Sequence, residues 1–176
     1  FAAIRQSCRS HHRAGKSHSR STVLKSAWSR EVSFDVSVVI PTYNRAEFLA
    51  ETLESVLSQT FQPKRVVVVD DGSTDNTAEI VDSLDSTVHY IRTANQGVVL
   101  ARMPGIAASN SRGIACCDSD DLWKPDHLEH HARLYEQYPD CRVSYSNFVH
   151  VVDGRWSERT KFSQAPVGYW DVDKRI

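Results

Sequence analysis

Short apolar runs rich in β-branched residues recur along the chain and predict β-strands. The clearest of them, at 65–71, has almost no polar alternation, so both of its faces are expected to be covered. Prolines and acidic turns end several of these runs, as at strand ends. The predicted strands lie at 34–41, 65–71, 88–93, 112–118 and 141–152.

Apolar residues recur at helical spacing between these runs and predict helices. The segment 44–59 has an apolar face, and Asn44 with Glu47 gives it a start that resembles a capping box. Ser73 or Thr74 is the expected cap of the next helix. The other helices are predicted at 73–85, at 97–110, and at 125–138 with Pro125 in its first position.

Strands and helices alternate in this order, which predicts an α/β fold: a mostly parallel sheet with helices on both faces. Right-handed crossovers place the carboxyl ends of the strands along one edge of the sheet. Ligands bind at that edge in open α/β sheets. The unusual polar residues follow strand ends there: 41–44 (PTYN), 70–73 (DDGS) and the acidic cluster 118–121 (DSDD).

Charge is distributed unevenly over the 176 residues, although the net charge is only −1. Residues 1–33 contain seven Lys or Arg and one acid, and the remainder carries a net charge of −7. We expect this basic, Ser-rich arm to be disordered. It also matches an organelle transit peptide or a segment that contacts nucleic acid or anionic lipid. Because the chain begins with Phe, we favour a non-native extension.

Several classes of protein are disfavoured by what the sequence lacks. No apolar run approaches the roughly 18–20 residues of a membrane span, and no secretory signal is visible. The four cysteines show no CxxC spacing, so we expect a cytoplasmic protein, free or peripheral at a membrane. GxGxxG, GxxxxGK[ST] and GxSxG motifs are absent, which argues against a dinucleotide site, a phosphate loop and a Ser hydrolase. No nucleic-acid partner is expected.

The acidic cluster of Asp118, Asp120 and Asp121 lies between a buried strand and a helix. Crowded carboxylates repel one another unless water or a cation screens them. Such ligands suit Mg²⁺ or Mn²⁺, bound through one or two carboxylates plus substrate phosphates. The cation would stabilise a diphosphate leaving group. A solvated turn is the alternative, and the cluster alone favours it.

Other polar residues at this edge are candidates for nucleotide binding. Asp70 or Asp71 would accept a hydrogen bond from a pyrimidine imide or a ribose hydroxyl, or would simply form an Asp-Gly turn. Tyr43 would stack on a base or pack under its loop. Arg102 would pair with a phosphate or lie solvated on its helix.

Four ordered blocks resemble the family 2 glycosyltransferases of the GT-A fold. They are "VSVVIPTYNRAEFLAETLESVLSQTF", "VVVVDDGSTDNT", "NQGVVLAR" with "GIAAS", and "CDSDDLWKPDHLE", over about residues 35–140. The resemblance implies a GT-A nucleotide-sugar-binding domain, which we place at 34–152. It also implies inverting transfer of a sugar from a nucleoside diphosphate sugar to a hydroxyl of a glycan, lipid or other acceptor.

The resemblance also implies roles for residues that match the motifs. Asp71 would bind the base, Asp118 would approach the ribose or sugar, and Asp120 would hold the metal on the diphosphate. The full set for the nucleotide sugar is Pro41, Thr42, Tyr43, Asp70, Asp71, Arg102 and Asp118. The set for Mn²⁺ or Mg²⁺ is Asp120, Asp118 and Asp121.

The chain departs from the family's pattern in two places. "ARMPG" stands where the family often has "ARN" followed by Gly, and Pro104 predicts a kink or a late helix start, since an interior proline costs about 3 kcal/mol. The family's catalytic base has no convincing counterpart after residue 141. We therefore expect a truncated donor-binding portion, with 153–176 beginning an incomplete acceptor-side region. A non-catalytic nucleotide-sugar-binding module and a nucleotidyltransferase are the alternatives.

Overall fold

The computed structural model describes residues 34–84, 87–152 and 155–160. The predicted arm at 1–33 and most of the predicted region 153–176 lie outside these residues. The described residues fall into two compact units, one within Glu31–Asp140 and one that begins at Cys141. The predicted domain boundary at 152 is not tested and stays a prediction.

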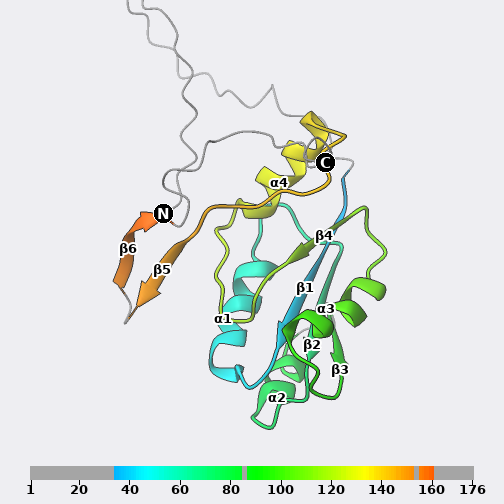
Figure 1. Ribbon diagram of the computed structural model, residues 1–176, viewed down its shortest axis with the longest axis vertical. Coiled ribbons are helices and arrows are strands. Elements are labelled where there is room, and N and C mark those ends of the chain that lie inside the picture. The colour runs from blue at the N-terminus through cyan, green and yellow to red at the C-terminus, as the bar shows by residue number, and fades with distance from the viewer. Residues whose placement is uncertain (1–33, 85–86, 153–154, 161–176) are drawn as a thin grey trace, which may run out of the picture. The chain divides into compact units, whose positions relative to one another are not determined.

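A four-stranded parallel sheet forms the centre of the unit within 31–140 (Figure 1). The strand order is β3-β2-β1-β4, so the first two strands of the sequence are the central pair. The α/β class with a parallel sheet is therefore confirmed. The strands are β1 (Val36–Thr42), β2 (Arg65–Asp70), β3 (Val88–Arg92) and β4 (Gly113–Cys116).

In the described part of the chain, four helices cover the sheet on both faces, as expected from the buried central strands. Alternate residues of β1 and β2 belong to two separate core clusters. One cluster includes Leu49, Val81 and Leu128 and packs under three helices, whereas the other includes Ala101 and packs under the fourth. The helices on the first face are α1 (Ala46–Leu57), α2 (Thr77–Asp82) and α4 (His127–Gln137), and α3 (Val98–Ala107) covers the second.

Three predicted helix starts are wrong by two to four residues. The helix α1 begins at Ala46, and Asn44 does not cap it because Asn44 has a left-handed backbone (φ 51°) and bonds to another loop. The helix α2 begins at Thr77, so Ser73 and Thr74 lie in the loop before it. The helix α4 begins at His127, two residues after Pro125.

Pro104 lies inside α3 and does not delay its start. The helix begins at Val98 and continues through Pro104 to Ala107, so the predicted late start is wrong. Gly105 lets this helix approach the sheet, because a Cβ on Gly105 would lie 2.5 Å from Val39 and 2.9 Å from Val69. Close packing against two central strands holds α3 in place despite the proline.

The unit that begins at Cys141 contains an antiparallel pair of strands in its described part. They are β5 (Val149–Val152) and β6 (Arg155–Thr160). The predicted strand 141–152 is wrong over its first eight residues, since 141–148 forms no strand there. Val143 and Tyr145 alternate with polar residues as in a strand but are both exposed, so the alternation does not mark a buried strand face here. No helix in the described ranges has the length and apolar character needed to cross a membrane.

Candidate functional site

The carboxyl edge of the sheet gathers the three polar loops that the sequence places after strands. Thr42 lies opposite Asp70 in the register of β1 and β2, and Asp70 lies opposite Arg92 of β3. The Cys117 amide donates to the Val39 carbonyl, 3.1 Å away, and so brings the acidic loop after β4 beside β1. The predicted convergence of these loops at one edge is confirmed.

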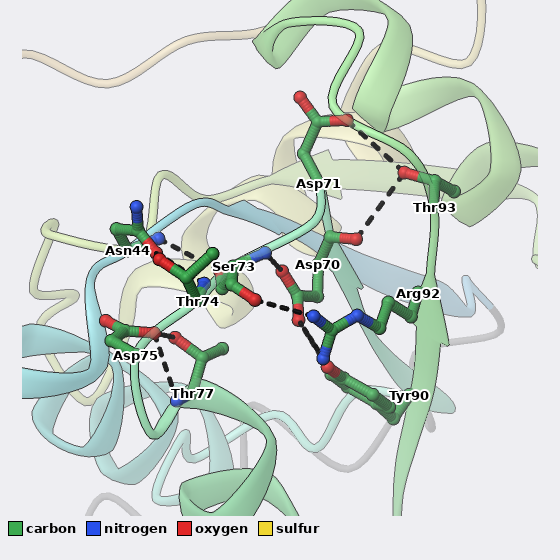
Figure 2. Close-up of polar contacts among 10 residues, drawn as sticks. All are labelled: Asn44, Asp70, Asp71, Ser73, Thr74, Asp75, Thr77, Tyr90, Arg92 and Thr93. Carbon is green, nitrogen blue, oxygen red and sulfur yellow. Dashed lines mark hydrogen bonds and ion pairs between the residues drawn. The ribbon is translucent and has the colours of Figure 1, made fainter.

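The loops after β1 and β2 are joined through Asn44 (Figure 2). The Asn44 amide donates to Ser73 Oγ at 2.9 Å, and the Thr74 amide donates to Asn44 Oδ1 at 2.8 Å. An asparagine tolerates the left-handed backbone that this reciprocal pairing requires. The Ala46 amide, the first of α1, donates to Asp75 Oδ2 at 3.1 Å. Each loop therefore satisfies polar groups of the other.

Asp70 is fully buried beneath these loops and anchors them to β3. It accepts hydrogen bonds from the Ser73 amide, at 2.7 Å, and from the Tyr90 hydroxyl. Arg92 lies 3.8 Å from the same carboxylate and donates to the Ser73 carbonyl at 2.6 Å. Burial, together with the hydrogen bond to Asp70, raises the pKa of Tyr90 to about 12, so its hydroxyl keeps its proton. Figure 2 shows these groups converging on Asp70.

Asp71 is also buried, and it organises the start of α3. Its carboxylate accepts hydrogen bonds from the amides of Gln96, at 2.9 Å, and Gly97, at 2.7 Å. Gly97 has a φ of 89°, a conformation that favours glycine. A carboxylate offers about four acceptor positions, so a base imide can still bond to it. The predicted role of Asp71 in base binding stays a prediction.

The residues predicted to surround the nucleoside differ in exposure. Pro41 and Thr42 are buried in β1, whereas Tyr43 is 46% exposed and presents its ring at the surface. Thr42 Oγ1 is buried, and the described residues provide no hydrogen-bond partner for it. Buried polar atoms are usually paired, so an ordered water or a ligand atom is expected at Thr42.

Arg102 and Asp118, which the sequence placed separately at this edge, are in contact. Arg102 Nη2 donates to Asp118 Oδ1 at 2.5 Å. About half of the Asp118 side chain remains exposed, and Oδ1 is the oxygen that bonds to Arg102. The guanidinium and the carboxylate therefore meet where a phosphate and a ribose or cation are expected.

Asp120 and Asp121 complete the acidic loop. The exposed Asp120 lies 3.8 Å from Arg45 Nε, a contact that the sequence did not suggest. Burial and the negative charges of Asp118 and Asp120 raise the pKa of Asp121. The loop is anchored to α1 because Thr52 Oγ1 donates to the Ser119 carbonyl at 3.0 Å. The carboxylates are thus held near one another on a fixed backbone.

A divalent cation fits this loop only if the substrate supplies ligands. In the described part of the chain, no three His, Cys, Asp or Glu side chains come together as a ready metal cage. Mg²⁺ is often held by one or two carboxylates plus substrate phosphates and water. Burial, and after it the charges of Asp118 and Asp120, raise the pKa of Asp121, and a cation near the loop would offset that neighbouring negative charge. The residues fit a cation that is shared with a diphosphate.

Comparison with known proteins identifies the family. The sequence profile of "Glycosyl transferase family 2" matches residues 37–173, so the chain belongs to this family. It is 39% identical over 119 residues to the glycosyltransferase GlyG of Streptococcus pneumoniae. This matched region covers 64% of this chain and 38% of GlyG. The chain spans less than two thirds of the length of such relatives.

Solved structures show the same fold. Fragment 1–349 of S. aureus TarS, in complex with UDP, has a TM-score of 0.58 and 28% identity, covering 71% of this chain and 38% of the fragment. The mannosyltransferase PcManGT of Pyrobaculum calidifontis, in complex with GDP-Man and Mn²⁺, has a TM-score of 0.53 and 27% identity. The matched region covers 64% of this chain and 36% of PcManGT. The predicted GT-A fold and family are confirmed.

Proposed function

We propose that this chain carries the donor-binding part of a glycosyltransferase that moves a sugar from a nucleoside diphosphate sugar to an acceptor hydroxyl with inversion. The contact between Arg102 and Asp118 at the carboxyl edge carries the proposal. In this proposal the Arg102 guanidinium would bind a phosphate and Asp118 would act beside it, while Tyr43 and Asp71, from the loops after β1 and β2, would bind the base. Family membership supports sugar transfer as the reaction class.

Each group would act on a different part of the donor. Tyr43 would stack on the base, and Asp71 would accept a hydrogen bond from it. Thr42 Oγ1 would hydrogen-bond to a polar atom of the nucleoside. Arg102 would pair with a phosphate oxygen, because a guanidinium matches phosphate geometry. Asp118 would accept a hydrogen bond from a ribose or sugar hydroxyl.

A Mn²⁺ or Mg²⁺ ion would be held by Asp120, with Asp118 and Asp121 beside it. When bound, it would stabilise the negative charge that develops on the diphosphate leaving group. PcManGT, solved with GDP-Man and Mn²⁺, supports divalent cation use in related enzymes. Inversion also needs a base that takes the proton of the acceptor hydroxyl. We assign this role to no residue in the described ranges.

The proposal is tested by calorimetry on the purified chain with UDP, GDP and dTDP, each with Mn²⁺ and with EDTA. We expect one nucleotide to bind with a strong dependence on Mn²⁺, and Asp120→Ala to remove that dependence. Asp82→Ala is the matched control, since Asp82 is an exposed acid of α2, outside the candidate site.

A cooperative thermal transition in circular dichroism without binding of any of the three nucleotides would overturn the proposal. Pyrophosphate release from nucleoside triphosphates, which marks a nucleotidyltransferase, is expected to be absent. Its detection would transfer the same site to that alternative class.

A further inference from the structure

Arg45 has a rigid backbone and an exposed side chain at the candidate donor site. On one side of it, Asn44 is fixed by its hydrogen bonds to Ser73 and Thr74. On the other side, the Arg45 carbonyl accepts from the amides of Phe48 and Leu49, both at 3.0 Å, in the first turn of α1. Half of the Arg45 side chain is nevertheless exposed. The Arg45 side chain is therefore held at this edge by its backbone and remains accessible to a ligand.

The partner of Arg45 in the structure is the carboxylate proposed to hold the cation. Arg45 Nε lies 3.8 Å from Asp120 Oδ2, beyond hydrogen-bond range, and both side chains are about half exposed. Such ion pairs contribute little stability, so this contact is easily exchanged. Arg102 also pairs with an acid of this loop, through a hydrogen bond to Asp118 at 2.5 Å. Two guanidinium groups therefore face two of the acids to which a metal is assigned.

A nucleoside diphosphate would change this arrangement. Its phosphate oxygens are better partners for Arg45 than Asp120 is, because the diphosphate carries more charge and can accept the paired hydrogen bonds that Asp120, 3.8 Å away, does not. An arginine that turns to the diphosphate leaves its carboxylate available to a cation. A cation without the diphosphate must instead compete with the arginine for the carboxylate.

We propose that Arg45 is a diphosphate-binding residue and that its ion pair with Asp120 makes cation binding depend on the donor. The inference rests on the proposed function, because it concerns the same donor site. It predicts two effects of opposite sign on removal of Arg45. Diphosphate binding becomes weaker, and cation binding without nucleotide becomes tighter.

The test measures both effects in the variant Arg45→Ala. Calorimetry with UDP in EDTA is expected to show about tenfold or greater weakening, the size of a lost charged hydrogen bond, with uridine unaffected. Electron paramagnetic resonance of Mn²⁺ alone is expected to show about two- to fivefold tighter binding, since an exposed ion pair is worth at most about 1 kcal/mol. If another nucleoside diphosphate binds the wild type best, it replaces UDP and its nucleoside replaces uridine.

Two further variants control the measurement. Arg65→Ala removes an exposed arginine at the opposite end of β2 and is expected to change neither affinity. Arg45→Lys keeps the charge but loses the paired geometry, so it is expected to restore part of the UDP affinity.

The inference is overturned if Arg45→Ala binds UDP as the wild type does. It is also overturned if the variant loses affinity for UDP, uridine and Mn²⁺ together, because that pattern indicates a distorted loop. A wild-type chain that binds no nucleoside diphosphate refutes the proposed function itself, and so the two failures are distinguishable.

Discussion

Gly105 is the residue through which α3 approaches the sheet, and Gly105→Ala tests how much that approach matters. The added Cβ would lie 2.5 Å from Val39 Cγ1 and 2.9 Å from Val69 Cγ2. Both valines are fully buried in the central strands, and β-branched side chains have few alternative rotamers. The methyl group therefore displaces the helix or strains the core. The same helix carries Arg102, one turn earlier.

Two opposing terms set the size of the effect. Alanine favours a helix interior over glycine by about 1 kcal/mol, whereas overpacking a well-filled core costs about 1–3 kcal/mol. Because neither valine can rotate away, we expect a net loss of about 1–2 kcal/mol in the free energy of unfolding. Urea denaturation followed by circular dichroism measures it. Met103→Ala, at an exposed position of the same helix, is the control and is expected to stay within about 0.5 kcal/mol of wild type.

A second variant separates overpacking from other causes. Val39→Ala removes the closer of the two valine contacts that the new Cβ would meet, so the double variant is expected to lose less stability than the sum of the two single variants. Nucleotide affinity should fall in Gly105→Ala and not in Met103→Ala, because Arg102 moves with the helix. If Gly105→Ala equals or exceeds the wild type in stability, the close packing of α3 does not constrain the fold as argued.

Two further predictions concern other helical residues. Pro104→Ala supplies the amide hydrogen that the Leu100 carbonyl lacks. We therefore expect urea denaturation to show a free energy of unfolding about 1–2 kcal/mol higher than that of the wild type. An unchanged midpoint would show that the proline does not destabilise the helix. Burial, together with the positive charges of His131 and His130, lowers the pKa of His127 to about 4. Unfolded His127 therefore binds its proton near pH 6.5, before the folded form does, and stability falls as the pH drops from about 6.5 to about 4. We expect the free energy of unfolding, measured by urea denaturation, to fall by about 2 kcal/mol at most between pH 7 and 5. The loss should be smaller in His127→Phe, which keeps a ring against Trp123. An equal loss in the variant would contradict this assignment.

The fold followed from the sequence because its central strands are apolar on both faces. A run such as Val66–Val69 has no polar face to expose, so it requires helices on both sides of the sheet. The start of α1 did not follow, because its polar partners are distant in the sequence. Asn44 bonds to Thr74 and the Ala46 amide bonds to Asp75, about thirty residues away. Capping rules that consider only neighbouring residues cannot detect such pairs.

The sequence predicted which loops form the candidate site, but it did not predict which residues each side chain contacts. Asp70 and Asp71 were both predicted to bind the nucleotide, and the structure shows in addition that Asp70 bonds to Ser73 and Tyr90 and lies near Arg92. Tyr90 and Arg92 were overlooked, although they alternate along β3 and lie opposite Val68 and Asp70. A prediction of strand register would have identified them. The register depends on long-range pairing that local patterns do not contain.

Burial divides the residues of this edge into anchors and contacts. The anchors are buried groups whose polar atoms bond to the backbone of a neighbouring loop or helix, and the contacts are side chains that the anchored loops leave about half exposed. Removing an anchor is expected to lower stability and nucleotide affinity together, because the loop itself moves. Removing a contact should lower affinity alone. Asp70 and Asp71 are anchors in this sense, and Tyr43, Arg45, Asp118 and Asp120 are contacts.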